Sequence, residues 1–182
     1  DRAIVLDQGS MSFSGAPAVA INHYMASARS AAASPATSRR SGSGEVRLAS
    51  VVPSAPVFDP AEPKRIELTT EANDYGLDYF VSVHIVDEFG NVIAQCDSRL
   101  ADLWLPGGSA QTTELVLESP WLRPGDYRVD TFVCAAGILD AWEGACLFSV
   151  SPTLPYPTAA NEEAIALGQT LASFSYGPSR SF

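Results

Sequence analysis

Residues 79–97 constrain the fold more than any other stretch, because two segments of alternating side chains follow each other with only a short turn between them. A repeat of two residues is the spacing of a half-buried β-strand, whose side chains point alternately to its two faces. Between the segments, Gly90 adopts positive φ at little steric cost, so the chain can reverse there. We therefore predict a central β-hairpin.

A two-residue turn at positions 89–90 sets the register of this hairpin, and a β-bulge would shift it by one residue. The unshifted register predicts three pairs: Asp87 with Val92, His84 with Gln95, and Ser82 with Asp97. One face of the hairpin is then apolar and carries Val81, Val83, Ile85, Ala94 and Cys96. The opposite face is polar and carries Ser82, His84, Gln95 and Asp97.

Extended segments recur along the chain between Gly, Pro, Asn and Asp residues, which is typical of a sandwich or barrel. Besides the two hairpin strands we predict five more, at residues 45–52, 64–72, 112–118, 125–134 and 145–151. Seven such strands bury their apolar sides most simply as two packed sheets. We expect an all-β, immunoglobulin-like antiparallel sandwich of about seven to eight strands, with a short N-terminal helix and a linker.

The predicted strand at residues 125–134 starts at a Pro124-Gly125 turn, and Tyr127 follows just after this turn. In immunoglobulin-like sandwiches a tyrosine at this place buries its ring and returns its hydroxyl to the corner. With Tyr127 inward, alternation places three side chains outward: Arg128, Asp130 and Phe132. If this strand lies beside the first hairpin strand, as in that topology, the three extend the polar face of the hairpin.

We name the combined surface the composite face, which consists of Ser82, His84, Gln95, Asp97, Arg128, Asp130 and Phe132. Carboxylates, an amide, a guanidinium and an aromatic ring on a firm sheet suit a sugar, which needs hydrogen bonds to its hydroxyls and a flat surface for its C–H groups. Outward polar residues of antiparallel strands also commonly do nothing but face water. Both interpretations are open at this point.

Trp142 is expected in the loop before the last strand, and we add it to the candidate glycan contacts because loops at sandwich ends often carry recognition. Catalysis has little support. His84 and Asp97 could act as a base and its orienter, but no serine lies in a Gly-x-Ser-x-Gly context and no oxyanion donor is evident. We predict no catalytic residue, no metal and no cofactor.

The formal net charge of -10 argues against a nucleic-acid partner, because binding to phosphates needs clustered Lys and Arg. No apolar run is long enough to span a bilayer. Three cysteines form an odd set without metal-ligand spacing, and Cys96 is expected as a buried thiol. A disulfide between Cys134 and Cys146 stays open, and it would favour a secreted, adhesin-like sandwich.

Residues 1–9, DRAIVLDQG, followed by Phe13-Ser14-Gly15, resemble the closing segment of an ABC-transporter nucleotide-binding domain. In that family a short helix, here expected from Pro17 to Met25, leads out of the domain. The chain contains no Gly-x-x-x-x-Gly-Lys-Ser/Thr phosphate loop, so we expect no ATP hydrolysis by this stretch itself. We take it to be a piece of a longer protein that is an ABC ATPase.

Four further motifs occur in order: GSGEVRL at 42–48, VSVHIVDEFG at 81–90, LRPGDY at 122–127 and FSV at 148–150. Together they resemble the C-terminal carbohydrate-binding domain of Wzt-like ATP-binding subunits of O-antigen ABC transporters. The resemblance implies binding of the non-reducing end of a lipid-linked O-antigen polysaccharide at the cytoplasmic side of the inner membrane, which selects chains for export. It also implies a transmembrane partner subunit and a homodimer. A structural dimerisation module without a glycan site is the alternative.

These interpretations divide the chain into four parts: residues 1–25, the tail of the nucleotide-binding domain; 26–43, a flexible linker; 44–151, the sandwich; and 152–182, a C-terminal extension. The extension is expected to hold a helix at 161–167, capped by Asn161 and ended by Gly168. Residues 171–176 are expected as a strand that pairs with a dimer partner's sheet edge, unless the extension packs on its own domain.

Overall fold

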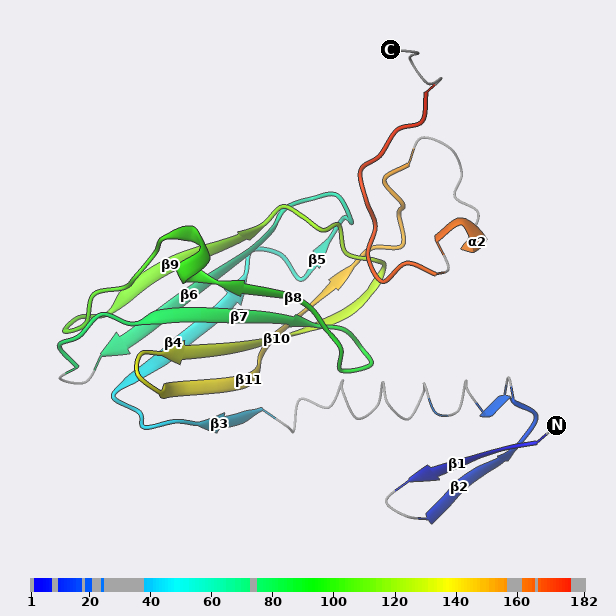
Figure 1. Ribbon diagram of the computed structural model, residues 1–182, viewed down its shortest axis with the longest axis horizontal. Helices are drawn as coiled ribbons and strands as arrows, with labels where there is room; N and C mark the ends of the chain where they lie inside the picture. Colours follow the sequence, from blue (N-terminus) through cyan, green and yellow to red (C-terminus); the bar gives the residue numbers. More distant parts are fainter. Residues whose placement is uncertain are drawn as a thin grey trace, which may run out of the picture.

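The computed structural model describes residues 2–7, 10–17, 19–20, 24, 38–72, 75–156, 162–165 and 167–177. Two sheets form a sandwich (Figure 1). The larger sheet has the strand order β3 (Arg39–Ser41), β11 (Ile138–Val150), β10 (Gly125–Cys134), β7 (Phe80–Val86) and β8 (Val92–Asp97), and β5 (Val57–Phe58) also pairs with β11. The smaller sheet has the order β4 (Val46–Pro53), β6 (Lys64–Ala72) and β9 (Gln111–Leu117).

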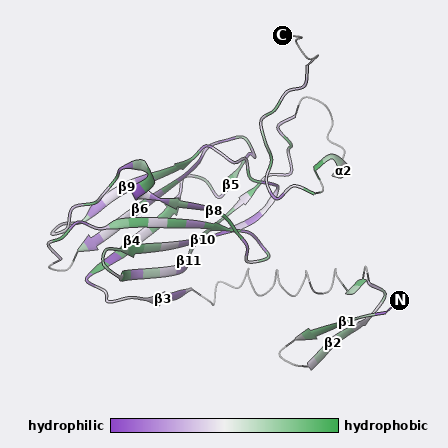
Figure 2. Cartoon of the chain, in the orientation of Figure 1, coloured by the Kyte–Doolittle hydropathy of each residue, from purple (hydrophilic) through white to green (hydrophobic). Residues whose placement is uncertain are grey.

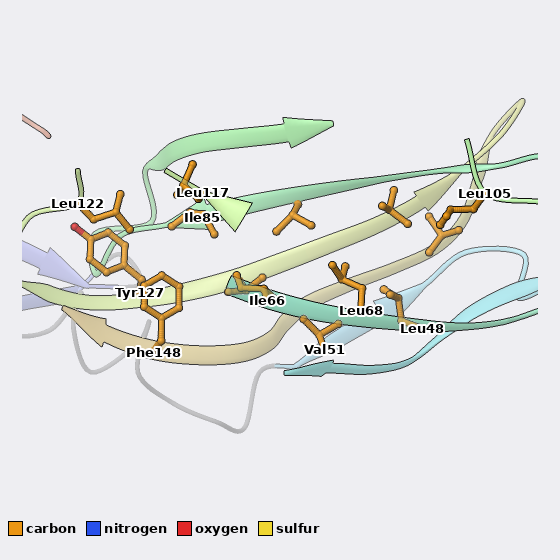
Figure 3. Close-up of a cluster of buried hydrophobic side chains, with 14 of the residues drawn as sticks. Leu48, Val51, Ile66, Leu68, Ile85, Leu105, Leu117, Leu122, Tyr127 and Phe148 are labelled. Atoms are coloured by element: carbon orange, nitrogen blue, oxygen red, sulfur yellow. The ribbon is translucent and has the colours of Figure 1, made fainter. Parts of the chain in front are cut away.

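The predicted all-β sandwich is confirmed. Apolar side chains from the facing sides of both sheets form one buried cluster, which includes Ile66 and Leu68 of β6 and Ile85 of β7 (Figure 3). Val129 of β10 belongs to the same cluster. The predicted tyrosine corner is also present, because the Tyr127 hydroxyl donates to the carbonyl oxygen of Arg123 at 2.9 Å while its ring is buried. All pairs between the described strands are antiparallel except β5 with β11.

The hairpin of β7 and β8 has the predicted register over most of its length. Ser82 pairs with Asp97 and His84 with Gln95, as expected. The predicted pair of Asp87 and Val92 is wrong, because a bulge after Ile85 lets Val92 pair with Val86 instead. The turn therefore begins one residue earlier, with the Gly90 N–H donating to the Asp87 carbonyl at 3.0 Å and Gly90 at φ 85°.

The last strand is longer than predicted, since β11 begins at Ile138 rather than at position 145. Trp142 therefore lies within a strand and not in a loop. The prediction missed the first part of β11 because of a bulge opposite Asp130. At this bulge Gly144 has φ 70°, and its N–H donates to the Asp130 carboxylate at 2.7 Å. A pattern of strict alternation cannot continue through such a bulge.

Two short strands were not predicted. β3 lies in the range assigned to the flexible linker and pairs with β11, while residues 26–37 of that range lie outside the described part of the chain. β3 consists of hydrophilic residues (Figure 2), so pairing rather than apolar burial holds it. β5 has only two residues and carries Phe58 into the core. The domain boundaries themselves remain predictions.

The N-terminal stretch forms a hairpin of β1 (Ala3–Asp7) and β2 (Ser10–Gly15). Of the helix expected from Pro17 to Met25, positions 17, 19, 20 and 24 are described and are helical, and the others lie outside the described residues. No helix within the described part of the chain combines the length and the apolar character needed to cross a bilayer.

The C-terminal extension contacts the sandwich of the same chain. Its helix α2 (Glu162–Ile165) lies where a helix was predicted, and the expected cap at position 161 is outside the described residues. Of the strand expected at 171–176, only Leu171 makes a β-bridge, to Trp121 of the same chain, and residues 172–176 are not in a strand within this single chain. Pairing of this segment with a dimer partner stays a prediction. Leu171 is buried, so it anchors the extension to its own domain.

Candidate functional site

Strand pairing assembles the composite face as two rows of neighbouring side chains. In one row Asp130 of β10 lies beside His84 of β7, which lies beside Gln95 of β8. In the other row Phe132 lies beside Ser82, which lies beside Asp97. The pairing of β10 with β7, on which the prediction depended, is thus present in the structure.

Asp130 and Arg128 form a fixed ion pair at one side of this face. The Arg128 guanidinium donates to both carboxylate oxygens of Asp130, at 2.8 and 2.9 Å, and the Gly144 N–H donates to the same carboxylate. Protein donors therefore reach both oxygens of Asp130, and the residue is only 6% exposed, so its carboxylate is largely closed to a ligand. Its role is to orient Arg128, whose half-buried guanidinium keeps its Nη1 group free of hydrogen bonds to the described residues.

Asp97 is likewise occupied, by Arg99. Two guanidinium hydrogen bonds of 2.9 and 2.8 Å and one from the Arg99 backbone N–H of 3.0 Å reach its carboxylate, which caps the 3-10 helix η2 (Ser98–Ala101). The hydrogen bonds from the Arg99 side chain hold the pKa of Asp97 below its ordinary value. Asp97 therefore supports the end of the composite face and does not offer free acceptor atoms.

His84, Gln95 and Phe132 form the part of the composite face that can contact a ligand. The His84 and Phe132 rings lie 4.8 Å apart between centroids, tilted by 46°. The His84 and Gln95 side chains make no hydrogen bond to any other described residue. Ser82 is buried, and its hydroxyl has no partner within the described part of the chain. The Phe132 ring thus lies beside an imidazole, and near an amide, that make no hydrogen bond to the other described residues.

Trp142 does not join the other candidate residues. It pairs with Thr131, whose side chain points into the core, and its own ring packs against the core cluster. The indole N–H donates to the Ser38 hydroxyl at 2.7 Å, and the Arg40 guanidinium lies 4.7 Å above the ring. Trp142 therefore fastens β3 to β11 in this structure.

An aromatic group at the other end of the composite face was missed. Phe80 precedes Ser82 by two residues on β7, so the same alternation that identified Ser82 could have found it. The Arg99 guanidinium lies 3.7 Å above the Phe80 ring, and the half-exposed ring of Trp104 meets Phe80 edge-on at 5.5 Å. This group gives the face a second apolar surface next to Asp97.

The three cysteines are free thiols, so the disulfide left open for Cys134 and Cys146 is absent. The two residues lie at different places on the ladder, because Cys134 pairs with Ile138 and Cys146 with Val129. Burial raises the pKa of Cys146 to about 12. The secreted, adhesin-like interpretation loses the one feature that favoured it.

The sequence matches no family model, and no curated protein matches it. Among solved structures, the crystal structure of the C-terminal domain of Wzt matches with a TM-score of 0.60, covering 79% of this chain and 89% of that chain. The fold of the present chain is therefore similar to that of the Wzt C-terminal domain. The sequence identity is 15%, so the likeness concerns the fold.

Two other solved structures match less well. They are the CARDB domain of a Pyrococcus furiosus protein in complex with di-metal ions, with TM-score 0.38, 12% identity and coverage of 58% and 87%, and the cupredoxin domain of amoB from Nitrosocaldus yellowstonii, with TM-score 0.40, 14% identity and coverage of 65% and 97%. No group of three or more His, Cys, Asp or Glu side chains within the described residues is arranged to hold a metal ion.

Proposed function

We propose that this chain carries a non-catalytic carbohydrate-binding domain that holds a polysaccharide on the composite face. The observation that carries the proposal is the group of His84, Gln95 and Phe132, in which an aromatic ring lies beside two polar side chains that make no hydrogen bond to other described residues. The neighbouring Arg128 is held in place by Asp130, so little side-chain entropy is lost when it binds. A sugar can stack one face on the ring and exchange hydrogen bonds with the polar groups around it.

The finer part of the proposal is the biological role. The Wzt-like fold and the ordered motifs support a domain of an O-antigen ABC exporter that recognises the non-reducing end of the lipid-linked polysaccharide and selects chains for export. In this proposal the full-length protein is an ABC ATPase at the cytoplasmic side of the inner membrane. It acts as a homodimer with a transmembrane subunit.

The direct test is a calorimetric titration of the chain with the O-polysaccharide of the source organism. His84→Ala and Phe132→Ala are expected to weaken binding about tenfold each, which corresponds to about 1.4 kcal/mol. Glu67→Ala, an exposed change on the opposite sheet, is the control and should leave the affinity unchanged. Absence of binding by the wild-type chain, or equal affinities for all variants, would refute the site.

The alternative is a dimerisation module, and one observation favours it. A cavity of about 340 Å³ opens between the edge strands β8 and β9, and its lining is largely apolar and includes Leu100, which is 86% exposed. Unpaired edge strands beside apolar side chains suit the edge of a second copy of this chain. If Leu100→Glu converts a dimer into a monomer in light scattering and no polysaccharide binds, the alternative replaces the glycan proposal.

A further inference from the structure

A cavity of about 550 Å³ lies at the end of the sandwich where the β7–β8 turn, the tyrosine corner and the C-terminal extension meet. We name it the tail cavity, and its lining consists of residues 87–89, 91, 93, 123–127 and 167–169. Sites for small ligands are commonly concave and of this volume. None of the residues in the composite face lines it, so it is a separate place on the molecule.

The walls of the tail cavity are held in place without a ligand. The carboxylate of Asp87 accepts hydrogen bonds from the Phe89 N–H at 2.9 Å and the Asn91 N–H at 2.8 Å, which fixes the turn. On the opposite side, Nη1 of Arg123 donates to the carbonyl oxygens of Ile165 at 2.8 Å and of Gly168, which fixes the extension. Preformed walls lower the ordering entropy that a ligand must overcome.

The chemistry of the lining suits hydroxyl groups. Arg123 keeps its Nε and Nη2 donors free of hydrogen bonds to the described residues, and the exposed Gln169 amide can both donate and accept. The Asn91 amide nitrogen donates to the Asp87 carboxylate at 2.9 Å, which leaves its second N–H and its oxygen for a ligand. Asp126 uses one carboxylate oxygen to accept from the Ser149 hydroxyl at 2.6 Å, which leaves the other oxygen for a ligand. A sugar hydroxyl donates to a carboxylate and accepts from a guanidinium, so one such group can bridge these walls.

The charge of the lining decides which sugars fit. Three carboxylates, those of Asp87, Glu88 and Asp126, lie around one guanidinium, that of Arg123. Uronic acids and phosphorylated sugars would be repelled by this excess of negative charge, whereas neutral sugars would not. The apolar side chains of Ile93 and Pro124 in the same lining offer contact to sugar C–H groups.

The tail cavity continues the line of the composite face. Asp126 lies two residues before Arg128 on β10 and therefore points to the same side of the sheet. From Asp126 to Phe132 the strand covers about 20 Å, which is long enough for several sugar units laid along it. A polysaccharide that rests on the His84–Phe132 platform can extend along β10 and reach the cavity.

We propose that the tail cavity binds one neutral sugar unit of the same polysaccharide that the composite face holds. The C-terminal extension forms one wall of this cavity. This inference rests on the proposed function. It assigns the extension a part in ligand binding, and it assigns the glycan to the neutral class.

The test begins with an array of neutral and acidic bacterial polysaccharides, probed with the full 182-residue chain. The best binder is then titrated calorimetrically into four variants: Asp126→Asn and Gln169→Ala in the cavity, Gln95→Ala on the composite face, and Glu67→Gln on the opposite sheet as the control. We expect a neutral polysaccharide as the best binder. Asp126→Asn should weaken it about tenfold and Gln169→Ala about threefold, since the first loses a hydrogen bond to a charged group.

Each of the other outcomes would refute a stated part of the two proposals. Cavity variants with wild-type affinity, beside a weakened Gln95→Ala, would refute the tail cavity and leave the proposed function standing. A preference for acidic polysaccharides would refute the neutral class. A wild-type chain that binds no polysaccharide on the array would refute both proposals. The amide NMR spectrum of each variant without ligand shows whether it is folded, and the shifts of Gly168 and Gln169 on titration then report binding at the cavity.

Discussion

Replacing Arg40, a residue of β3, by alanine tests how much one hydrogen-bonded cluster between the two sheets contributes to stability. The Arg40 guanidinium donates to the two carboxylate oxygens of Asp140 at 3.0 and 2.7 Å and to the Leu48 carbonyl at 2.5 Å. The carboxylate of Asp140 also accepts from the Leu48 N–H at 2.8 Å. Since Asp140 lies on β11 and Leu48 on β4, this cluster connects the larger sheet with the smaller one.

The magnitude follows from the burial of the two partners. The Asp140 side chain is 3% exposed, so without Arg40 it becomes a buried carboxylate with a single remaining donor. Removing one partner of a fully buried pair costs about 3 to 5 kcal/mol, but water can reach the place of Arg40, which is 35% exposed. We therefore expect Arg40→Ala to lower the free energy of unfolding by about 2 to 3 kcal/mol.

Urea unfolding followed by tryptophan fluorescence provides the assay, as a double-mutant cycle of Arg40→Ala and Asp140→Ala. The expected coupling is about 2 kcal/mol. The matched control is the ion pair of Arg65 and Glu114, which has a similar distance of 2.8 Å but is about half exposed, and its coupling should be about 0.5 kcal/mol. Equal coupling in the two cycles would refute the reasoning, because burial would then make no difference.

Three other changes have defined outcomes. Tyr127→Phe should lower stability by about 1 kcal/mol at neutral pH through loss of the hydrogen bond to Arg123. Burial raises the pKa of Tyr127 to about 12, above its ordinary value of 10.0, so the wild type should lose stability as the pH rises from about 10 to 12, and the variant should lose less in alkaline urea titrations. Lys64→Met should lower stability by about 2 kcal/mol in the same assay, because the buried Lys64 ammonium donates to three backbone carbonyls of the 59–62 loop, and wild-type stability would contradict this. Leu171→Ala should release the C-terminal extension, seen as faster proteolysis after position 156 with little change in sandwich unfolding, and an unchanged cleavage rate would show that Leu171 does not anchor it.

Much of the candidate site could be predicted because it depends on alternation. The bounds of β6 and β10 agree with the predicted ones. The pairs of Ser82 with Asp97 and His84 with Gln95 are also as predicted, because the bulge after Ile85 offsets the one-residue difference in the turn. A period of two determines the face on which each side chain lies, whatever the strand later packs against. The glycan interpretation of that face remains a proposal.

The sequence could not predict which side chains of the composite face are already bound by other protein groups. Asp130 lies on the predicted face, but a bulge in β11 brings the Gly144 N–H to its carboxylate. Asp97 lies on the face too, yet it caps η2 and binds Arg99. Trp142 was placed in a loop because the bulge breaks the alternation of β11. Hydrogen-bond partners are chosen by geometry in three dimensions, which periodicity does not contain.

The sequence by itself determined the sandwich, the tyrosine corner and the row of polar residues on β7 and β10, because each depends on local spacing and turn chemistry. Only the tertiary structure decided that β3 and β5 pair with β11, and that Arg40 meets Asp140, 100 residues away. It also decided that the extension lines a cavity beside Arg123. These contacts involve short or polar segments that carry no hydrophobic pattern. Their positions are therefore set by partners that are distant in the sequence.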